Sequence, residues 1–310
     1  MVSIDGLRSD ALTALPAGSL PALERLMSGA YTLDARTDPE FTTTLPNHVG
    51  MLTSRFFGGE GGHRWSKNYL VLAEETLHLA RGEYTSGIFH VAQASGLHTA
   101  MIAAKEKFRV FPLSWNLPGD VPVLKNYYFE PDTFSGSALV ADFLDSSAGV
   151  GSLCLWHIRD LDVAGHGEGQ GWSMAADSEY MKALQLVDVA LGNLLSHLDK
   201  YPSLRQRTAI ILTSDHGGGV PLHGHWSLGL HSLNWTIPLL AWSGRGAFSG
   251  NLYELNRIVR TNPGNEISLP GTSPPAITNA DIGNLGLHIL GLPPVPGSTV
   301  NVLQNLVLSP

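Results

Sequence analysis

Residues that commonly bind catalytic metal ions stand shortly after several apolar segments of the chain. The carboxylates and imidazoles in question are Asp5, Asp162, His166, Asp215, His216 and one histidine among His223, His225 and His231. Zinc uses carboxylate oxygen and imidazole nitrogen in tetrahedral sites, and its catalytic sites leave one position open. Three aspartates and three histidines suit two zinc-like ions about 4 Å apart, which would clamp the attacking and leaving oxygens during displacement at an anionic ester.

A threonine in the segment Thr-Thr-Leu-Pro-Asn-His could supply the nucleophile of this chemistry. Its hydroxyl, at Thr44, is a poor nucleophile unless a base or a metal ion removes the proton. We expect Pro46 to fix a turn that presents Thr44 at the start of a helix, where backbone N–H groups favour an anion. Asn47 would donate its amide hydrogens to a non-bridging oxygen as charge develops. Thr43 is the alternative register for the nucleophile.

The composition is that of a globular protein with enough apolar material for a core. Of the 310 residues, 43 % are hydrophobic and 15 % are charged. The net charge of −8 argues against binding of nucleic-acid polymers, because proteins that follow phosphate backbones carry basic stripes. It still permits a small anionic ester as the substrate, because bound metal ions can invert the local field. The oligomeric state is not indicated.

No apolar stretch is long enough for a membrane helix, and Cys154, the only cysteine, cannot form an intramolecular disulfide. Met1 lies only four residues before Asp5, which leaves a very short first strand. We therefore expect a single catalytic domain over residues 1–310 that lacks a few N-terminal residues of its first strand. A signal segment on such a missing piece would make the protein periplasmic or secreted; the compartment is otherwise unspecified.

Short apolar segments that end at polar residues or glycine predict buried parallel strands. These segments are Met1–Ile4, Thr99–Ala103, Gly151–Ile158, Thr208–Thr213 and Ile237–Trp242. Helical periodicity is clearest over Asp177–Lys200, and Ile88–Ser95 and Ala280–Leu290 are also expected to be helical. Strands that alternate with helices predict an α/β fold with a central, mostly parallel sheet sandwiched by helices. Ligands in such folds gather at the carboxyl ends of the strands.

Other polar residues follow the same predicted strands. Lys105 and Lys107 come after Thr99–Ala103 and could contact a phosphate. His157 and Arg159 come at the end of Gly151–Ile158 and could support the metal ligands by hydrogen bonding.

Taken together, several sequence blocks resemble the alkaline phosphatase superfamily and, within it, the type I phosphodiesterase/nucleotide pyrophosphatase branch. The blocks are Ser-Ile-Asp-Gly-Leu-Arg, Thr-Thr-Leu-Pro-Asn-His with Leu-Thr-Ser-Arg after it, Asp-Val-Ala-Gly-His, Thr-Ser-Asp-His-Gly-Gly, Asn-Trp-Thr-Ile-Pro-Leu-Leu-Ala-Trp and Leu-Gly-Leu-Pro-Pro-Val-Pro-Gly-Ser. Each is a weak motif alone, but their order along nearly the whole chain is specific. The resemblance implies an alkaline phosphatase-like fold.

The resemblance also implies two sets of metal ligands, with Thr44 between them as the covalent nucleophile and Asn47 on the oxyanion side. The first set is Asp162, His166 and a late histidine, and the second is Asp5, Asp215 and His216. For the late histidine, His225 best matches the spacing to Thr-Ile-Pro in shorter bacterial relatives, followed by His231 and then His223.

We therefore expect a two-metal hydrolase of phosphodiesters or nucleotide pyrophosphates that forms a phosphothreonine. The preference for diesters rests on threonine in place of serine, and on the lack of an obvious phosphate-clamping arginine just after it. A phosphomonoesterase or phosphonate hydrolase would share every metal ligand and differ in pocket charge. A sulfatase fits less well, because the nucleophile block lacks Cys-x-Pro-x-Arg. A catalytically inactive metal- or ligand-binding relative would be expected to have lost ligands, whereas every ligand type is present here.

Overall fold

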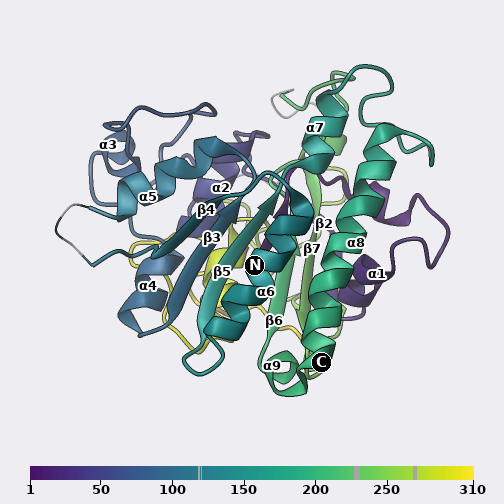
Figure 1. Cartoon of the computed structure of the whole chain (residues 1–310). Coiled ribbons are helices and arrows are strands. Elements are labelled where there is room, and N and C mark those ends of the chain that lie inside the picture. The colour runs from purple at the N-terminus through teal and green to yellow at the C-terminus, as the bar shows by residue number, and fades with distance from the viewer. Residues whose placement is uncertain (118, 120, 227–230, 268–270) are drawn as a thin grey trace.

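A mixed eight-stranded sheet runs through the centre of the protein (Figure 1). The structure is a computed structural model that describes residues 1–117, 119, 121–226, 231–267 and 271–310. The strand order is β4-β3-β5-β1-β6-β7-β2-β8. The strands are β1 (Val2–Ile4), β2 (Ala30–Arg36), β3 (His98–Ala103), β4 (Asn126–Phe129), β5 (Ser152–Ile158), β6 (Ala209–Thr213), β7 (Thr236–Ser243) and β8 (Gly250–Asn251).

Five neighbouring strands, from β4 to β6, are parallel to one another. All five predicted strands are present within two residues of their expected bounds, and the mostly parallel α/β fold is confirmed. One orientation was wrong, because β7 pairs antiparallel with both β6 and β2. Between β6 and β7 the described residues form only the short helix α10 (Ser232–Trp235), whereas a parallel return needs a longer crossover, usually a helix.

Helices cover both faces of the sheet (Figure 1). On one face α1 (Pro21–Met27), α6 (Thr133–Ser146) and α8 (Glu179–Lys200) share a core with Ala100 and Ile102 of β3. On the other face α2 (Thr44–Thr53), α4 (Ile88–Ala94) and α12 (Asp281–Ile289) pack in cores that include Met101, Ala103 and Ile211. The alternation along β3 follows from the two-residue period of a strand.

The predicted helices are confirmed, with shorter ends than expected. The Ser178 hydroxyl accepts a hydrogen bond from Met181 N (3.1 Å), so α8 begins at Glu179 rather than at Asp177. The remaining helical segments are short: η1 (Ser9–Thr13), α3 (Leu77–Arg81), η2 (Glu106–Arg109), α5 (Val110–Trp115), α7 (Asp160–His166), α9 (Pro202–Gln206) and α11 (Leu252–Leu255). Within the described residues, none of the helices combines the length and apolar character that crossing a membrane requires.

The carboxyl ends of β3, β5, β1 and β6 lie side by side, because these strands are parallel neighbours. Lys105 follows β3, Asp162 lies in α7 just after β5, Asp5 follows β1 and Asp215 follows β6. The topology therefore brings four charged residues from distant parts of the sequence to one edge of the sheet.

The strand β1 begins further along the sheet than the neighbouring strands β5 and β6. Val2 pairs with Trp156 and with Leu212, whereas β5 begins at Ser152 and β6 at Ala209. The Met1 ammonium donates to the Cys154 carbonyl oxygen (2.7 Å). Beside it is a mostly apolar cavity of about 260 Å³ lined by residues of β5, β6, α6 and α8.

Candidate active site

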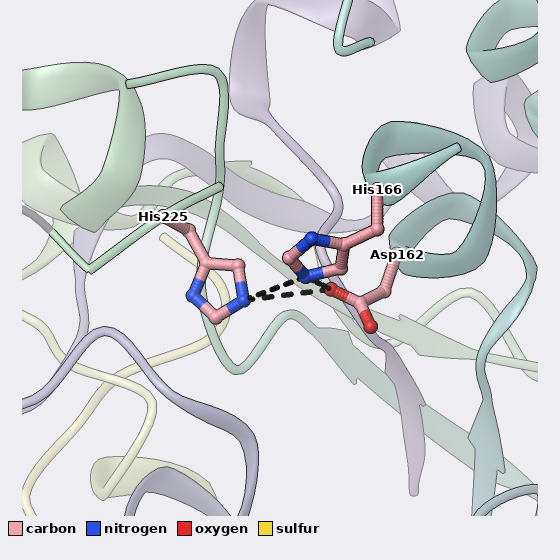
Figure 2. Close-up of side chains that lie close together, drawn as sticks. All are labelled: Asp162, His166 and His225. Carbon is pink, nitrogen blue, oxygen red and sulfur yellow. Dashed lines mark hydrogen bonds and ion pairs between the residues drawn. The ribbon is translucent and has the colours of Figure 1, made fainter. Parts of the chain in front are cut away.

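One group of possible metal ligands combines α7 with the loop after β6 (Figure 2). Asp162 and His166 are one turn apart on α7, and His166 Nε2 lies 3.3 Å from Asp162 Oδ1. His225 Nε2 lies 3.7 Å from the same oxygen and 3.1 Å from His166 Nε2. The Nδ1 atoms of His166 and His225 bond the backbone oxygens of His223 and Thr42. With the protons on Nδ1, both Nε2 lone pairs point to a common centre, as metal binding requires.

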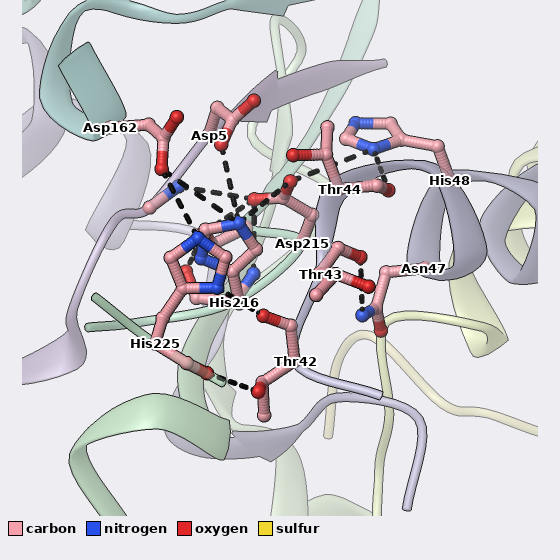
Figure 3. Close-up of polar contacts among 12 residues, drawn as sticks. Asp5, Thr42, Thr43, Thr44, Asn47, His48, Asp162, Asp215, His216 and His225 are labelled. Carbon is pink, nitrogen blue, oxygen red and sulfur yellow. Dashed lines mark hydrogen bonds and ion pairs between the residues drawn. The ribbon is translucent and has the colours of Figure 1, made fainter. Parts of the chain in front are cut away.

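A second group lies at the ends of β1 and β6 and is fully buried (Figure 3). His216 Nε2 is 3.4 Å from Asp5 Oδ1, 3.4 Å from Asp215 Oδ2 and 4.0 Å from Asp162 Oδ1. The ligand atoms of Asp5, Asp162 and His216 all lie within 4.8 Å of one another. Asp162 is thus part of both groups. Asp215 adjoins the second group by its contact with His216.

Four atoms of these side chains are buried and have no hydrogen-bond partner within the described residues: Asp5 Oδ1, Asp162 Oδ1, Asp215 Oδ2 and His216 Nε2. Such unpaired groups are costly inside a protein and need an explanation. The same atoms face one another in the distances above, and their oxygen and nitrogen donors suit zinc. The residues therefore fit divalent metal ions; their number and identity stay predictions.

Thr44 is the first residue of α2 and is buried. Its Oγ1 lies 3.5 Å from Lys105 Nζ, and Figure 3 shows it beside the carboxylates. Thr43 is the N-cap residue and lies in an extended conformation just before the helix. Of the two registers considered, the structure therefore brings Thr44 to the metal-ligand groups.

Asn47 has a different environment from the one expected. Its Nδ2 donates to the carbonyl oxygens of Phe41 (2.9 Å) and Thr43 (3.0 Å). Its Oδ1 accepts from Asp38 N (2.9 Å) and Asn279 Nδ2 (2.9 Å). Both amide hydrogens hold the loop before α2, so donation to a substrate oxygen would require breaking one of these bonds.

Asn68 was not among the candidates, yet the structure places it at the first turn of α2. Its Oδ1 accepts from Leu45 N (3.0 Å) and from Lys107 Nζ (2.9 Å). These bonds orient the side-chain amide next to the residue that follows Thr44. Asn68 lies 24 positions after Thr44 in a segment without regular secondary structure, where neither spacing nor periodicity indicates a role.

Lys105 is the central cation of the site. Its Nζ lies 2.6 Å from Asp5 Oδ2 and 2.6 Å from Asp162 Oδ2. Burial alone would lower the pKa of Lys105, but these two carboxylates outweigh it and hold the pKa above its ordinary value. The ammonium uses one oxygen of each carboxylate and leaves the other, Oδ1, facing the histidines.

The three aspartates do not carry equal charge. Burial, together with the charge of Asp5, raises the pKa of Asp215 to about 7. Burial also opposes ionisation of Asp5, but Lys105 and His157 hold its pKa well below the ordinary value. Burial beside His216 lowers the pKa of His225 to about 3, so this imidazole is neutral at neutral pH and able to bind a metal ion.

Two further buried histidines support the candidate site through hydrogen bonds. His157 accepts from Ala104 N at Nδ1 (3.2 Å) and therefore donates from Nε2 to Asp5 Oδ2 (3.0 Å). This contact is the supporting role expected of His157. His48 is buried between Ser3 Oγ (2.8 Å from Nε2) and the Thr44 carbonyl oxygen (2.7 Å from Nδ1), so it anchors the start of α2 to β1.

The two alternatives to His225 lie elsewhere. His231 is exposed and precedes α10 as its N-cap residue. His223 contributes its backbone oxygen to His166. Of the three histidines, only His225 has a ring nitrogen in the candidate metal groups formed by the described residues.

This fold is like that of solved structures from the alkaline phosphatase superfamily, and its carboxyl edge carries candidate metal-binding aspartates and histidines. Residues 115–220 match the model of the type I phosphodiesterase/nucleotide pyrophosphatase family, which confirms the resemblance seen in the sequence. No curated protein sequence matches the chain significantly.

Solved structures of the same fold have low sequence identity to this chain. An alkaline phosphatase superfamily protein from Vibrio parahaemolyticus is 13 % identical (TM-score 0.63; 99 % of this chain, 69 % of that one). The lipoteichoic acid synthase LtaP from Listeria monocytogenes is 13 % identical (0.65; 98 % and 74 %). Murine ectonucleotide pyrophosphatase/phosphodiesterase 5, as an inactive variant in complex with AMP, is 17 % identical (0.57; 99 % and 98 %). These likenesses show the fold, and the family match supports a phosphoester hydrolase.

Proposed function

We propose that this protein is a two-metal-dependent hydrolase of phosphoesters that forms a covalent phosphothreonine at Thr44. The observation that carries the proposal is the convergence of three aspartates and three histidines at one edge of the sheet, where Lys105 Nζ lies 3.5 Å from Thr44 Oγ1. Four of their buried ligand atoms have no hydrogen-bond partner within the described residues. A site built only for stability would leave few such atoms without partners.

The two proposed sets of metal ligands are Asp162 with His166 and His225, and Asp5 with Asp215 and His216. Divalent ions bound there, zinc by the type of ligand, would lower the pKa of the Thr44 hydroxyl and neutralise charge on the phosphoryl oxygens.

Thr44 Oγ1 would attack phosphorus in line with the leaving alcohol, and water would then cleave the phosphothreonine to phosphate or a phosphate monoester. The Lys105 ammonium, 3.5 Å from Oγ1, would stabilise the deprotonated hydroxyl. We propose Asn68 rather than Asn47 as the donor to a non-bridging oxygen, because the bonds to Asn47 already use its amide hydrogens.

Phosphodiesters or nucleotide pyrophosphates are the proposed substrates, supported by the family match over residues 115–220. A second candidate, hydrolysis of phosphate monoesters or phosphonates, is favoured by Lys105 and Lys107. The Lys105 ammonium would be a positive group beside the nucleophile in addition to the two proposed metal ions. Lys107 contacts Asn68 at the first turn of α2. Extra positive charge favours a substrate group with two negative charges over one with a single charge.

The test compares bis-p-nitrophenyl phosphate with p-nitrophenyl phosphate as substrates of zinc-loaded protein. Thr44→Ala should lower turnover by roughly a thousandfold or more, as expected for loss of a covalent nucleophile. Thr43→Ala, one residue away, should change it less than about tenfold, because the Thr43 side chain makes no cap bond to α2.

Acid quenching during turnover should trap one phosphoryl group on the peptide that contains Thr44. Preference for the monoester would keep the mechanism and select the second candidate. Full activity of Thr44→Ala, or a phosphoryl group on another residue, would show that Thr44 is not the nucleophile.

A further inference from the structure

A pocket of about 200 Å³ is lined in part by the residues that immediately precede Thr44 in the chain. Its walls come from the loop before α2 (Phe41, Thr42 and Thr43) and from Trp226 and Ile267. Trp226 is 60 % exposed, so its ring is accessible to a ligand. We call this feature the Trp226 pocket.

Two hydrogen bonds fix the pocket to the metal-ligand groups. The Thr42 hydroxyl donates to the His225 carbonyl oxygen, and His225 Nδ1 donates to the Thr42 carbonyl oxygen (Figure 3). His225 thereby points Nε2 at His166 and Asp162, while the next residue in the chain forms the pocket wall. Thr43 also lines the pocket and directly precedes the proposed nucleophile. The pocket is therefore lined by the chain neighbours of both the proposed nucleophile and a proposed metal ligand.

The lining of the Trp226 pocket indicates what it can hold. Of its described lining residues, Glu40 alone is charged, and the exposed lining is almost entirely apolar. A second phosphate or a carboxylate would meet Glu40 there without a cation to offset it. A cavity of ~150 Å³ holds benzene, so this volume accepts one aromatic ring or a short alkyl chain.

We propose that the Trp226 pocket binds an uncharged aromatic or alkyl group of the substrate, so that the protein acts on phosphoesters or phosphonates carrying one apolar substituent. The assignment rests on the proposed function, because the pocket is placed relative to Thr44 and His225. Burial of the substituent against Trp226 and Phe41 would supply binding energy.

The test varies the substituent while keeping the leaving group constant. Zinc-loaded protein is assayed with p-nitrophenyl phenylphosphonate and p-nitrophenyl methylphosphonate, which have the same charge. The wild type should prefer the phenyl compound in kcat/KM by roughly tenfold or more. Trp226→Ala should remove most of that preference by lowering kcat/KM for the phenyl compound alone, and Trp226→Phe should retain it.

The matched control is Tyr201→Ala, which removes another half-exposed aromatic ring at the C-terminal end of α8. It should leave the preference unchanged. Equal activity of the wild type on both compounds, or an equal loss on both in Trp226→Ala, would overturn the assignment.

A binding measurement separates this inference from the proposed function. Phenylphosphonate and methylphosphonate themselves, which carry no leaving group, are titrated into zinc-loaded wild type and Trp226→Ala by calorimetry. Tighter binding of phenylphosphonate that depends on Trp226 supports the pocket even if no ester is hydrolysed. Equal or undetectable binding of the two ligands to the wild type overturns it, whatever the hydrolytic activity.

Discussion

Replacing Lys105 by methionine should destabilise the metal-free protein strongly. The substitution keeps a long unbranched side chain and removes the ammonium that lies 2.6 Å from both Asp5 and Asp162. These two carboxylates are largely buried and would lose their common cation. Removing one partner of a buried ion pair costs about 3–5 kcal/mol, because the other charge remains uncompensated.

The expected change in melting temperature follows from the size of the chain. With an unfolding entropy of about 2.1 cal/mol/K per residue, a loss of 3–5 kcal/mol over 310 residues lowers Tm by roughly 5–8 °C. Zinc should narrow the gap, because ions at the candidate sites would neutralise the same carboxylates. The rise in Tm on adding zinc should therefore be larger in Lys105→Met than in the wild type.

The assay is thermal unfolding in EDTA and in excess zinc, with Lys182→Met as the control. Lys182 pairs with Glu179 at 2.8 Å, but both side chains are more than half exposed, and exposed pairs contribute only about 0–1 kcal/mol. A change of 1 kcal/mol in stability corresponds to about 1.5 °C in Tm for a chain of this size. If Lys105→Met in EDTA melted within about 1 °C of the Lys182→Met control, the assignment of Lys105 as the central cation would be refuted.

Two further substitutions probe the surroundings of the site. Gly165→Ala would place a Cβ 2.3 Å from the Trp172 ring, so we expect a loss of about 1–3 kcal/mol of stability, measured by thermal unfolding. The control is Gly192→Ala in α8, whose Cβ would meet nothing closer than 3.9 Å and which should be neutral or stabilising. Equal effects of the two substitutions would show that the contact with Trp172 is not the cause. Lys107→Met tests a partly buried charge. Loss of solvation lowers the pKa of Lys107 to about 8 from 10.5, so on raising the pH the folded state releases this proton before the unfolded state does. The charge of Lys107 therefore destabilises the folded state fully below pH 8, and this destabilisation disappears towards pH 10.5. The amount by which the Tm of Lys107→Met exceeds that of the wild type should shrink across that range. A constant difference in Tm would show that the charge is not the cause.

The strands that apolar runs predicted are those buried on both faces. β5 and β6 read as continuous Leu, Ile and Trp segments, and their burial follows from the parallel sheet. The strand β2 escaped notice because polar residues interrupt the apolar ones in its sequence, Ala-Tyr-Thr-Leu-Asp-Ala-Arg, and the polar Thr32 and Arg36 are among the buried ones. The antiparallel direction of β7 depends on how the chain returns from β6, which the apolar run itself does not encode.

The position of a candidate ligand was predictable where the residue comes within two positions of a strand end. Asp5 and Asp215 needed only the strand ends to be recognised, and the i, i+4 spacing of Asp162 and His166 placed them on one face of a helical turn. The choice of His225 over His223 and His231 depends on its bond to Thr42, 183 positions earlier in the chain. The contacts of Lys105 and Asn68 are likewise tertiary, so local pattern could not assign them.

Asp162 is common to both candidate metal groups formed by the described residues. Its Oδ1 lies 3.3 Å from His166 Nε2, 3.7 Å from His225 Nε2 and 4.0 Å from His216 Nε2. An ion bound by either group would draw on the charge of the same carboxylate. Occupancy of one group should therefore change the affinity of the other, so the two candidate sites are not independent binders.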